Sequence, residues 1–382
     1  MRLQRHRVAI GAGAALLVVL VVVGVALFLS RGPATSPTPP VVAPSATPTT
    51  PSPTRAPLTG LPVADPGALD HPAVAVKVSD VREAHPQAGV DRADIVFVEP
   101  IGVAYTRLAA VFHSDVPDRV GPVRSARPMD AALLSPMRPV LASTMAAEWV
   151  MRYVDEVADV DHLGSLRVAD ADAYVRDPTR PRPDDVFTDP VLLLELSDRT
   201  EAPPPYFSYS SDLAGSSAVR AAAVGSTVEI PYGPGWSVRW SYDEASGRYL
   251  REQPWGPHET TEAVQVSATN VLVLEVGSLT QKLSEGGGAP VPVLQLVDGA
   301  GSFVALSGGH RVTGTWSKAA VDRPFRLTTT AGDPLMLAPG TTWVEMPAPD
   351  AGVVVRRPTT GPPGRSRMRR ESACTPGRSP PT

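Results

Sequence analysis

Cysteine is nearly absent from this 382-residue chain: Cys374 stands alone, so no intramolecular disulfide can form. Lysine is scarce too, because Lys77, Lys282 and Lys318 are the only lysines among 35 basic residues. Aromatic residues make up 5% of the chain, and its formal charge is −4. These values exclude a disulfide-rich miniprotein and a strongly basic nucleic-acid-binding protein.

Sequence motifs with a known chemical mechanism are also missing. The histidines include no pair at helical i, i+4 spacing, and there is neither a Gly-x-Ser-x-Gly elbow nor a phosphate-binding P-loop. Asp159, Asp161 and His162 lie close together in sequence but do not match a calcium-binding loop. We therefore expect no metal and no cofactor, and the sequence assigns no catalytic residue.

The chain has only one long apolar run, at residues 8–29. As a helix this run would span about 33 Å, enough to cross a bilayer. Arg2, Arg5 and Arg7 precede it in a basic end, residues 1–7, which predicts a cytoplasmic N-terminus and an extracytoplasmic remainder. We expect a retained single-pass anchor in the cell membrane. A cleaved signal peptide is the alternative.

Two segments of biased composition flank the part expected to fold. Residues 30–56 are rich in Pro, Thr and Ser, which predicts an extended linker. Residues 348–382 are rich in Arg, Pro and Gly, which predicts a disordered basic tail. Between these segments acidic residues outnumber basic ones, so the folded part is acidic and its appendages are basic.

The first half of the folded part, residues 57–205, mixes strand and helix signals. Thr144 can cap a helix that runs to about residue 157, and Asp189 followed by Pro190 is typical of a helix start. Strands interspersed with helices favour an N-terminal α+β domain with mixed α/β layers. The strands are predicted from short apolar runs at residues 74–78, 95–98 and 108–112.

The second half, residues 206–347, shows mainly strand signals. Trp236, Val238 and Trp240 alternate with polar residues, as in a strand with one buried face. Residues 293–297 and 303–306 flank a Gly/Asp turn and predict a hairpin. We expect a mainly antiparallel β domain, and an α+β fold class for the whole chain behind one N-terminal transmembrane helix.

The densest polar motif is GPVRSAR at residues 121–127, between a predicted strand and a predicted helix. Its two arginines lie three residues apart and can present several donors to a carboxylate or a phosphate. Thr106 and Arg107 begin the preceding strand. Glu99 lies upstream of them and could orient one arginine. The predicted anion-binding site consists of Arg124, Arg127, Arg107, Ser125, Glu99 and Thr106.

Two other interpretations of these residues stay open. The arginines could form a buried network with carboxylates, for example Arg124 with Glu99, and bind no ligand. An acid–base hydrolase would instead need paired groups in one cleft, such as Glu99 or Asp94 with His113.

Several short motifs also occur in the order and spacing of a known family. Together they resemble the YerB-like lipoproteins, a two-domain bacterial envelope family of unknown function. The resemblance covers about residues 57–347 and implies an N-terminal α+β domain and a C-terminal mainly-β domain outside the cytoplasm. The motifs are PLTGLP (57–62), AVAVKV (73–78), PQAG (86–89), ADIV (93–96), TR (106–107), GPVRSAR (121–127), WSYD (240–243), YLR (249–251), GTWS (314–317) and PGTTW (339–343).

The chain departs from the family pattern in three places. No cysteine follows the apolar run at the position where the family attaches lipid, so the helix itself would be the anchor. Residues 102–104 replace an acidic-Gly-Gly stretch, and Pro-Asp-Asp at 183–185 replaces a Pro-His-Asn-type motif. Since Arg124 and Arg127 remain, the resemblance favours binding over catalysis.

We therefore expect a membrane-anchored extracytoplasmic protein that recognises an anionic cell-wall component and no nucleic acid. A hydrolase acting on wall glycan or peptide is one alternative. A scaffold for other envelope proteins is another, and it would expose an apolar patch.

Overall fold

The computed structural model describes residues 54–102, 105–144, 146–281 and 291–357. The basic end, the predicted transmembrane segment 8–29, most of the predicted linker and most of the predicted tail lie outside these residues. Among the helices that the structure does describe, none has the length and apolar character needed to cross a membrane. Residues Pro53–Thr382 cluster as one compact unit.

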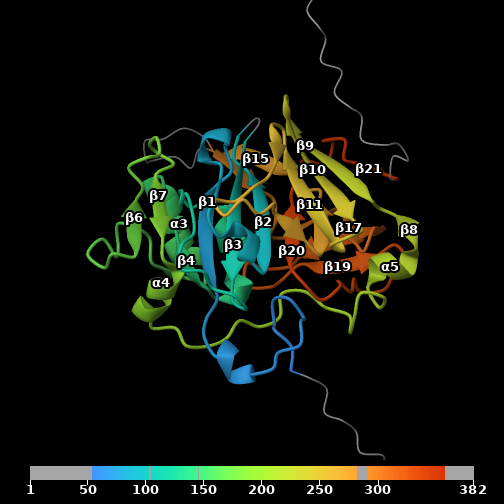
Figure 1. Cartoon of the computed structure of the whole chain (residues 1–382), viewed down its shortest axis with the longest axis horizontal. Coiled ribbons are helices and arrows are strands. Elements are labelled where there is room, and N and C mark those ends of the chain that lie inside the picture. Colours follow the sequence, from blue (N-terminus) through green and yellow to red (C-terminus); the bar gives the residue numbers. More distant parts are fainter. Residues whose placement is uncertain (1–53, 103–104, 145, 282–290, 358–382) are drawn as a thin grey trace, which may run out of the picture. The chain divides into compact units, whose positions relative to one another are not determined.

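A large mixed sheet contains strands from both halves of the chain (Figure 1). Its strands follow one another in the order β19-β18-β17-β14-β20-β2-β3-β1-β4-β5, and β8 pairs with β18 at one side. The bounds are β19 Arg326–Thr329, β18 His310–Lys318, β17 Gly299–Ser307, β14 Asn270–Leu274, β20 Thr342–Glu345, β2 Ile95–Pro100, β3 Thr106–Phe112, β1 Val74–Ser79, β4 Val140–Ala142, β5 Asp161–His162 and β8 Ala223–Val224.

Seven of these strands run in the same direction as β1, and six of the seven form two groups of parallel neighbours. β1, β4 and β5 pair in parallel, as do β2, β20 and β14. β3 lies between the two groups and is antiparallel to both β1 and β2. The six parallel strands therefore end at one edge of the sheet, which we call the carboxyl edge. In open α/β sheets this edge is the usual place for ligands.

Smaller elements complete the described fold. A second sheet has the order β12-β11-β10-β9-β21, with β13 paired to β11, and two further pairs are β15-β16 and β6-β7. The bounds are β12 Gly256–Pro257, β11 Arg248–Gln253, β10 Trp236–Asp243, β9 Thr227–Gly233, β21 Val354–Arg356, β13 Ser267–Ala268, β15 Ser278–Gln281, β16 Val291–Leu294, β6 Tyr174–Arg176 and β7 Val186–Thr188. The helices are α2 Met129–Leu134, α3 Glu148–Val157, α4 Pro190–Leu196 and α5 Ser217–Ala221, with short 3₁₀ turns η1 Pro66–Leu69, η2 Arg82–Ala84, η3 Val90–Arg92 and η4 Ser135–Met137.

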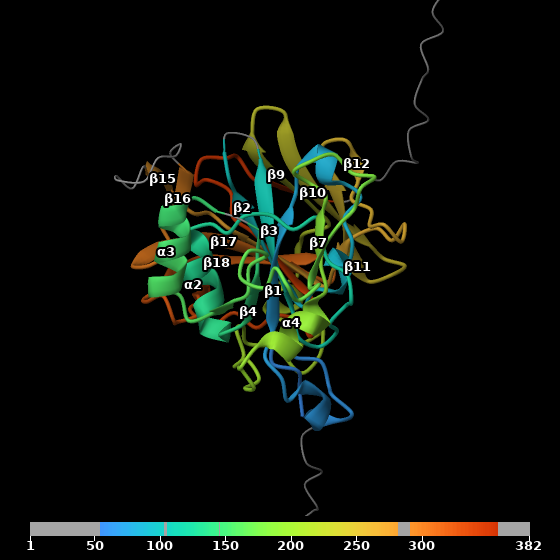
Figure 2. The ribbon, with the colours of Figure 1, turned by 90° about the vertical axis from the view of Figure 1, so that its left-hand side faces the viewer.

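Consecutive residues are buried all along β1, β3 and β14. Since successive side chains of a strand point to opposite faces, both faces of the sheet are buried there. On the first face Phe97 and Leu141 pack against helices α2 and α3. On the second face Val76 and Trp343 pack against the second sheet, around Trp240, and against α4. Figure 2 shows α2 and α3 to one side of the sheet. Strands buried on both faces explain the continuous apolar runs in the sequence.

The predicted strands at 74–78, 95–98 and 108–112 are confirmed as β1, β2 and β3. The helix predicted after Asp189 is also confirmed: the Asp189 carboxylate accepts the backbone N–H groups of Val191 and Leu192, and Pro190 occupies the first turn. Helix α3 begins at Glu148, however, and its cap position Ala147 makes no side-chain hydrogen bond. The prediction of Thr144 as its cap was therefore wrong.

The hairpin predicted from residues 293–297 and 303–306 is wrong. β16 pairs with β15, whereas β17 pairs with β18 across a turn at Gly308 and Gly309. The second half is also not wholly antiparallel, because β20 pairs in parallel with both β14 and β2. The partners β2 and β14 are far from β20 in sequence, so these parallel pairings leave no local signal in the sequence.

Strand β18 depends on a glycine at its centre. A Cβ atom on Gly314 would lie 2.1 Å from the Thr328 carbonyl oxygen and 2.6 Å from ring carbons of Phe303. We expect Gly314→Ala to lower the free energy of unfolding by about 1–3 kcal/mol, because a packed sheet cannot absorb the overlap. Chemical denaturation measures this, and Gly67→Ala, which meets no atom closer than 3.4 Å, is the control. Equal stability of the two variants would contradict the prediction.

Candidate functional site

A row of polar side chains crosses the first face of the sheet at the carboxyl edge. Strand alternation places Lys77, Glu99 and Arg107 on the same face as the apolar residues that pack against α2 and α3. Ser143 follows β4, and His162 ends β5. Five neighbouring strands thus bring chemically active side chains to one edge.

Two residues of this row, Lys77 and Glu99, form a buried ion triad with Asp130 of α2. Lys77 Nζ lies 2.6 Å from Glu99 Oε1 and 2.6 Å from Asp130 Oδ1, with all three side chains inaccessible to solvent. Burial and the nearby Asp130 raise the pKa of Glu99 to about 8, although Lys77 opposes the shift. Two carboxyl groups share one ammonium, so one of them tends to keep its proton. Glu99 was expected to orient an arginine, but it makes its hydrogen bond to Lys77.

Next to this triad lies the arginine cluster, which we define as Arg107, Arg124 and Arg127. Each guanidinium gives an Nη1 hydrogen bond to a backbone carbonyl, of Ser125, Pro183 and Ala126 respectively. The Nε atoms of all three are buried and find no acceptor among the described residues. Arg124 Nε approaches only Asp184, at 3.7 Å.

Like charges crowd the arginine cluster. Burial and, to a lesser degree, the neighbouring Arg127 and Arg124 charges together lower the pKa of Arg107 to about 9. Burial likewise lowers the pKa of Arg127, against the attraction of Glu99 and Asp130. A bound anion would remove this repulsion and supply the missing acceptors.

The loop that carries two of the arginines is fixed to the sheet by its backbone. The Arg124 N–H donates to the carbonyl of Lys77, and the Arg124 carbonyl accepts the N–H of Thr144. At the other end, the Arg127 N–H donates to Asp130 Oδ2 at 2.7 Å. The loop therefore bridges the ends of β1 and β4, and this anchoring positions its side chains over the carboxyl edge.

The structure brings five of the six predicted site residues together on this face. Arg107, Arg124, Arg127 and Ser125 are in contact through hydrogen bonds or charge, and Glu99 lies behind them. Thr106 does not join them. As the neighbour of Arg107 on the same strand it points to the opposite face, where its hydroxyl donates to Asp80 Oδ2 at 2.7 Å.

Sequence patterns gave no sign of a Ser–His–Asp arrangement at the other end of the row. Ser143 Oγ lies 2.8 Å from His162 Nε2, and His162 Nδ1 lies 3.5 Å from Asp155 Oδ1. The connectivity matches a hydrolytic triad, but Ser143 is fully buried and Gly164 packs over the pair. No substrate can reach a nucleophile in that position. The hydrogen bond joins the ends of β4 and β5.

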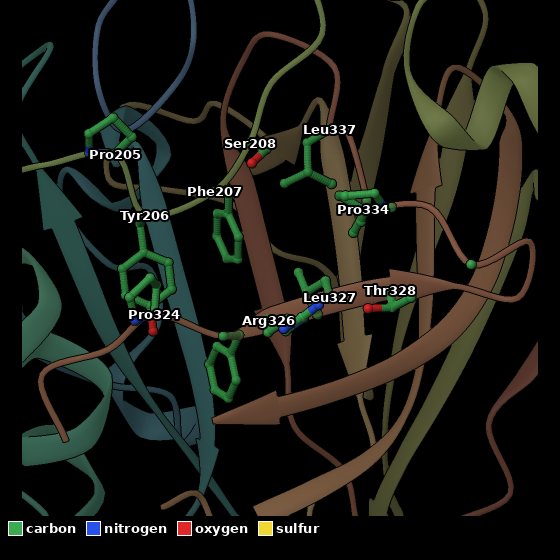
Figure 3. Close-up of a pocket in the computed structure, with 13 residues that line it drawn as sticks. Pro205, Tyr206, Phe207, Ser208, Pro324, Arg326, Leu327, Thr328, Pro334 and Leu337 are labelled. Carbon is green, nitrogen blue, oxygen red and sulfur yellow. The ribbon is translucent and has the colours of Figure 1, made fainter. Parts of the chain in front are cut away.

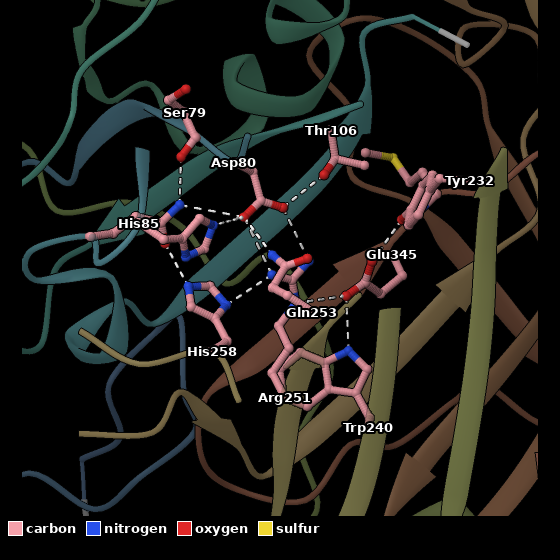
Figure 4. Close-up of polar contacts among 12 residues, drawn as sticks. Ser79, Asp80, His85, Thr106, Tyr232, Trp240, Arg251, Gln253, His258 and Glu345 are labelled. Carbon is pink, nitrogen blue, oxygen red and sulfur yellow. Dashed lines mark hydrogen bonds and ion pairs between the residues drawn. The ribbon is translucent and has the colours of Figure 1, made fainter. Parts of the chain in front are cut away.

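On the second face of the same edge, a buried polar network joins the two halves of the chain (Figure 4). Asp80, directly after β1, lies 3.3 Å from Arg251 of β11. It also accepts hydrogen bonds from Gln253 at 2.8 Å and from Thr106. Burial alone would raise the pKa of Asp80, but the Arg251 charge and a hydrogen bond from His85 hold it far below its ordinary value.

Arg251 is the hub of the network. Besides Asp80, its Nε approaches Glu345 Oε1 at 3.4 Å, and that carboxylate accepts Trp240 Nε1 at 2.8 Å and the Tyr232 hydroxyl at 2.6 Å. Two carboxylates from β1 and β20 thus surround one guanidinium from the second sheet. Removal of one partner from such a buried ion group strongly destabilises the fold, because the remaining charge stays buried and uncompensated.

Asp80, His85 and His258 place potential metal-ligand atoms within 4.8 Å of one another. The donor set does not fit a cation. Arg251 Nη1 donates to His258 Nδ1 at 2.9 Å, so His258 Nε2 carries the proton that Gln87 Oε1 accepts at 2.6 Å. Both ring nitrogens of His258 are engaged, and the adjacent guanidinium would repel a metal ion.

The structure does not bring Glu99 and His113 together. Glu99 pairs with Arg107 near the carboxyl edge, whereas His113 follows β3 at the opposite edge, about 20 Å away along the strands. Asp94 does lie beside His113, but its carboxylate accepts the backbone N–H groups of His113 and Ser114. His113 Nε2 faces the carbonyls of Leu69 and His71. These contacts fix chain segments and form no acid–base pair.

A separate pocket of about 490 Å³ is lined mainly by aromatic, leucine and proline residues (Figure 3). Tyr206, Phe207 and Phe325 pack along one side, and Leu327, Leu335 and Leu337 also line it. Arg326 is the only charged residue that lines the pocket. The lining carries no convergent set of titratable groups, so the pocket offers no chemistry comparable to the arginine cluster.

Comparisons with known proteins agree with this architecture. Two family models match, described as "Protein of unknown function (DUF3048) N-terminal domain" over residues 58–202 and the corresponding C-terminal domain over residues 228–344. The chain belongs to this two-domain, YerB-like family. Both matched segments contribute strands to the large sheet. The arginine cluster lies wholly in the segment that matches the N-terminal domain.

One relative is YerB of Bacillus subtilis, whose name marks it as a candidate lipoprotein. The chain is 45% identical to it over 73 residues, which are 19% of this chain and 22% of the relative's length. The chain thus matches about a fifth of that protein in sequence. The crystal structure of Bacillus subtilis YerB has a TM-score of 0.67 at 22% identity, and the match covers 80% of this chain and 100% of that chain. The likeness shows a common fold.

Removing Arg251 tests whether its buried ion pair with Asp80 stabilises the fold. We expect Arg251→Met to lower the free energy of unfolding by about 3–5 kcal/mol, because it leaves the Asp80 and Glu345 carboxylates buried without their cation. Chemical denaturation measures this. Arg239→Met breaks an exposed pair with Glu252 and should cost less than about 1 kcal/mol. A comparable loss in both variants would contradict the assignment.

The same pair predicts how stability depends on pH. The pKa of Asp80 is depressed in the fold. Its carboxylate therefore contributes to the free energy of unfolding above the unfolded pKa of about 3.9, and this contribution is lost as the pH falls below that value. We expect Asp80→Asn to flatten the loss of stability below about pH 4, as measured by denaturation between pH 2 and 7. Asp115→Asn, at a solvent-exposed pair, is the control. An unchanged acid slope in Asp80→Asn would contradict the prediction.

Proposed function

We propose that this protein is a membrane-associated, extracytoplasmic protein that binds an anionic group of the cell envelope. The location is supported by the apolar segment at residues 8–29 and by the lipoprotein name of the Bacillus subtilis relative. The Pro/Thr/Ser-rich stretch after that segment would let the folded part reach away from the membrane.

The arginine cluster is the observation that carries the binding role. Arg107 is only 2% exposed, and its Nε has no acceptor in the described part of the chain. Arg124 and Arg127 share this feature, and both are partly exposed. Buried donors without acceptors are costly, so a cluster of three points to a missing partner. A ligand from solvent would meet the partly exposed Arg124 and Arg127 first, with the buried Arg107 behind them.

Hydrolysis has less support than binding. Glu99 and His113 lie at opposite edges, and Ser143 is buried beneath Gly164. A scaffold role has no comparable feature among the described residues, because their exposed large apolar side chains, such as Leu166 and Tyr105, come from separate parts of the chain.

Sedimentation of the full chain with isolated cell wall tests the proposal. We expect wall binding that weakens as salt rises, and Arg124→Ala/Arg127→Ala should reduce it at least ten-fold, since charge-assisted hydrogen bonds are worth about 1.5–3 kcal/mol each. Arg239→Ala/Arg323→Ala removes the same charge from exposed positions and is the matched control. Melting temperatures report whether each variant folds.

Two outcomes would overturn the proposal. One is equal binding by the folded cluster variant and by the wild type. The other is an equal loss in the control variant, which would show that only the overall charge matters.

A further inference from the structure

The number of free donors in the arginine cluster constrains the ligand. Three guanidinium groups carry fifteen N–H donors in all, and each group uses only one of them on a backbone carbonyl. A carboxylate is planar and has two oxygens, which one guanidinium fork can already occupy. The three neighbouring forks together offer more donors than a single carboxylate can accept.

Uncharged donors also lie near the arginine cluster. Ser79 pairs with Arg107 in the β1–β3 register, on the same face, and its buried hydroxyl has no partner among the residues described. Within the loop, the backbone N–H groups of Ser125 and Ala126 donate to no described residue, although their neighbours on either side do. Hydroxyl and backbone donors beside arginines are typical of sites for tetrahedral oxyanions.

The local charge also fits a ligand with more than one negative charge. Lys77 and the three arginines are the cations, and Glu99, Asp130 and Asp184 are the facing carboxyl groups. The excess is one positive charge if every carboxyl is ionised, and two if Glu99 keeps its proton. A phosphate monoester carries about −1.5 to −2 near neutral pH.

We propose that the arginine cluster binds a phosphoryl group, with three or more of its oxygens on Arg107, Arg124 and Arg127. This inference rests on the proposed anion-binding function and specifies its ligand class. The phosphoryl oxygens accept from the free Nε–H groups, and the Ser79 hydroxyl lies at the floor of the site. A wall polymer that carries phosphate monoester groups and a lipid headgroup that ends in a phosphate monoester would both present this chemistry.

Calorimetric titration of the full chain in uncharged detergent tests the ligand class. The probes are inorganic phosphate, glycerol phosphate and malonate, a dianion built from planar carboxylates, at constant ionic strength and pH 7.5. We expect both phosphates to bind at least ten-fold more tightly than malonate. Vesicles with and without a phosphatidic acid headgroup, and isolated wall with and without its phosphate polymers, then distinguish the two sources.

Charge-conserving variants show whether the fork geometry matters. Arg107→Lys keeps the charge but loses the planar fork, so phosphate affinity should fall at least ten-fold. Arg127→Lys serves the same purpose if the buried Arg107 position does not tolerate the change. Arg323→Lys, at an exposed site, is the control and should leave phosphate affinity unchanged.

The outcomes separate the two proposals. If malonate binds as tightly as phosphate, or if both cluster variants bind phosphate like the wild type, the phosphoryl assignment is wrong and the anion-binding function can still stand. If no probe binds and the wall does not sediment the protein, both proposals fail.

Discussion

The fold depends on one buried ion pair, between Asp80 at the end of β1 and Arg251 in the second sheet. The two residues are far apart in sequence, and each is inaccessible to solvent. A buried carboxylate or guanidinium is costly unless its charge and hydrogen-bonding capacity are met. Gln253, Thr106 and Glu345 complete that requirement, so the network fixes how the second sheet packs on the first.

The same requirement explains why binding chemistry lies on the other face of the edge. Alternation along β1 and β3 sends Asp80 and Thr106 to the second face, and Lys77 and Arg107 to the first. On the second face, carboxylates match the arginine and the network is nearly satisfied. On the first face, Glu99 and Asp130 engage Lys77, so the three arginines lack full compensation. One edge therefore has a structural face and a face with unused donors.

Some local patterns in the sequence predicted local structure, although the Thr144 cap and the hairpin at residues 293–306 were wrong. Continuous apolar runs predicted β1, β2 and β3, and Asp189 with Pro190 predicted the start of α4, because these signals act within a few residues. Arg107 lies beside the loop that carries Arg124 and Arg127, and their role in binding stays a prediction. The pairing of β20 with β2, the role of Asp80 with Arg251, and the reversal of Thr106 all depend on contacts between distant segments. No spacing or composition encodes such contacts in one sequence.

A crystal structure of the protein, determined with and without phosphate, is the most direct test of this account. The account predicts tetrahedral density in the arginine cluster, with oxygens about 2.7–3.2 Å from the Nε atoms of Arg107 and Arg127, and no such density without phosphate. Guanidinium groups turned onto protein carboxylates, with the space between them closed in both crystals, would contradict it.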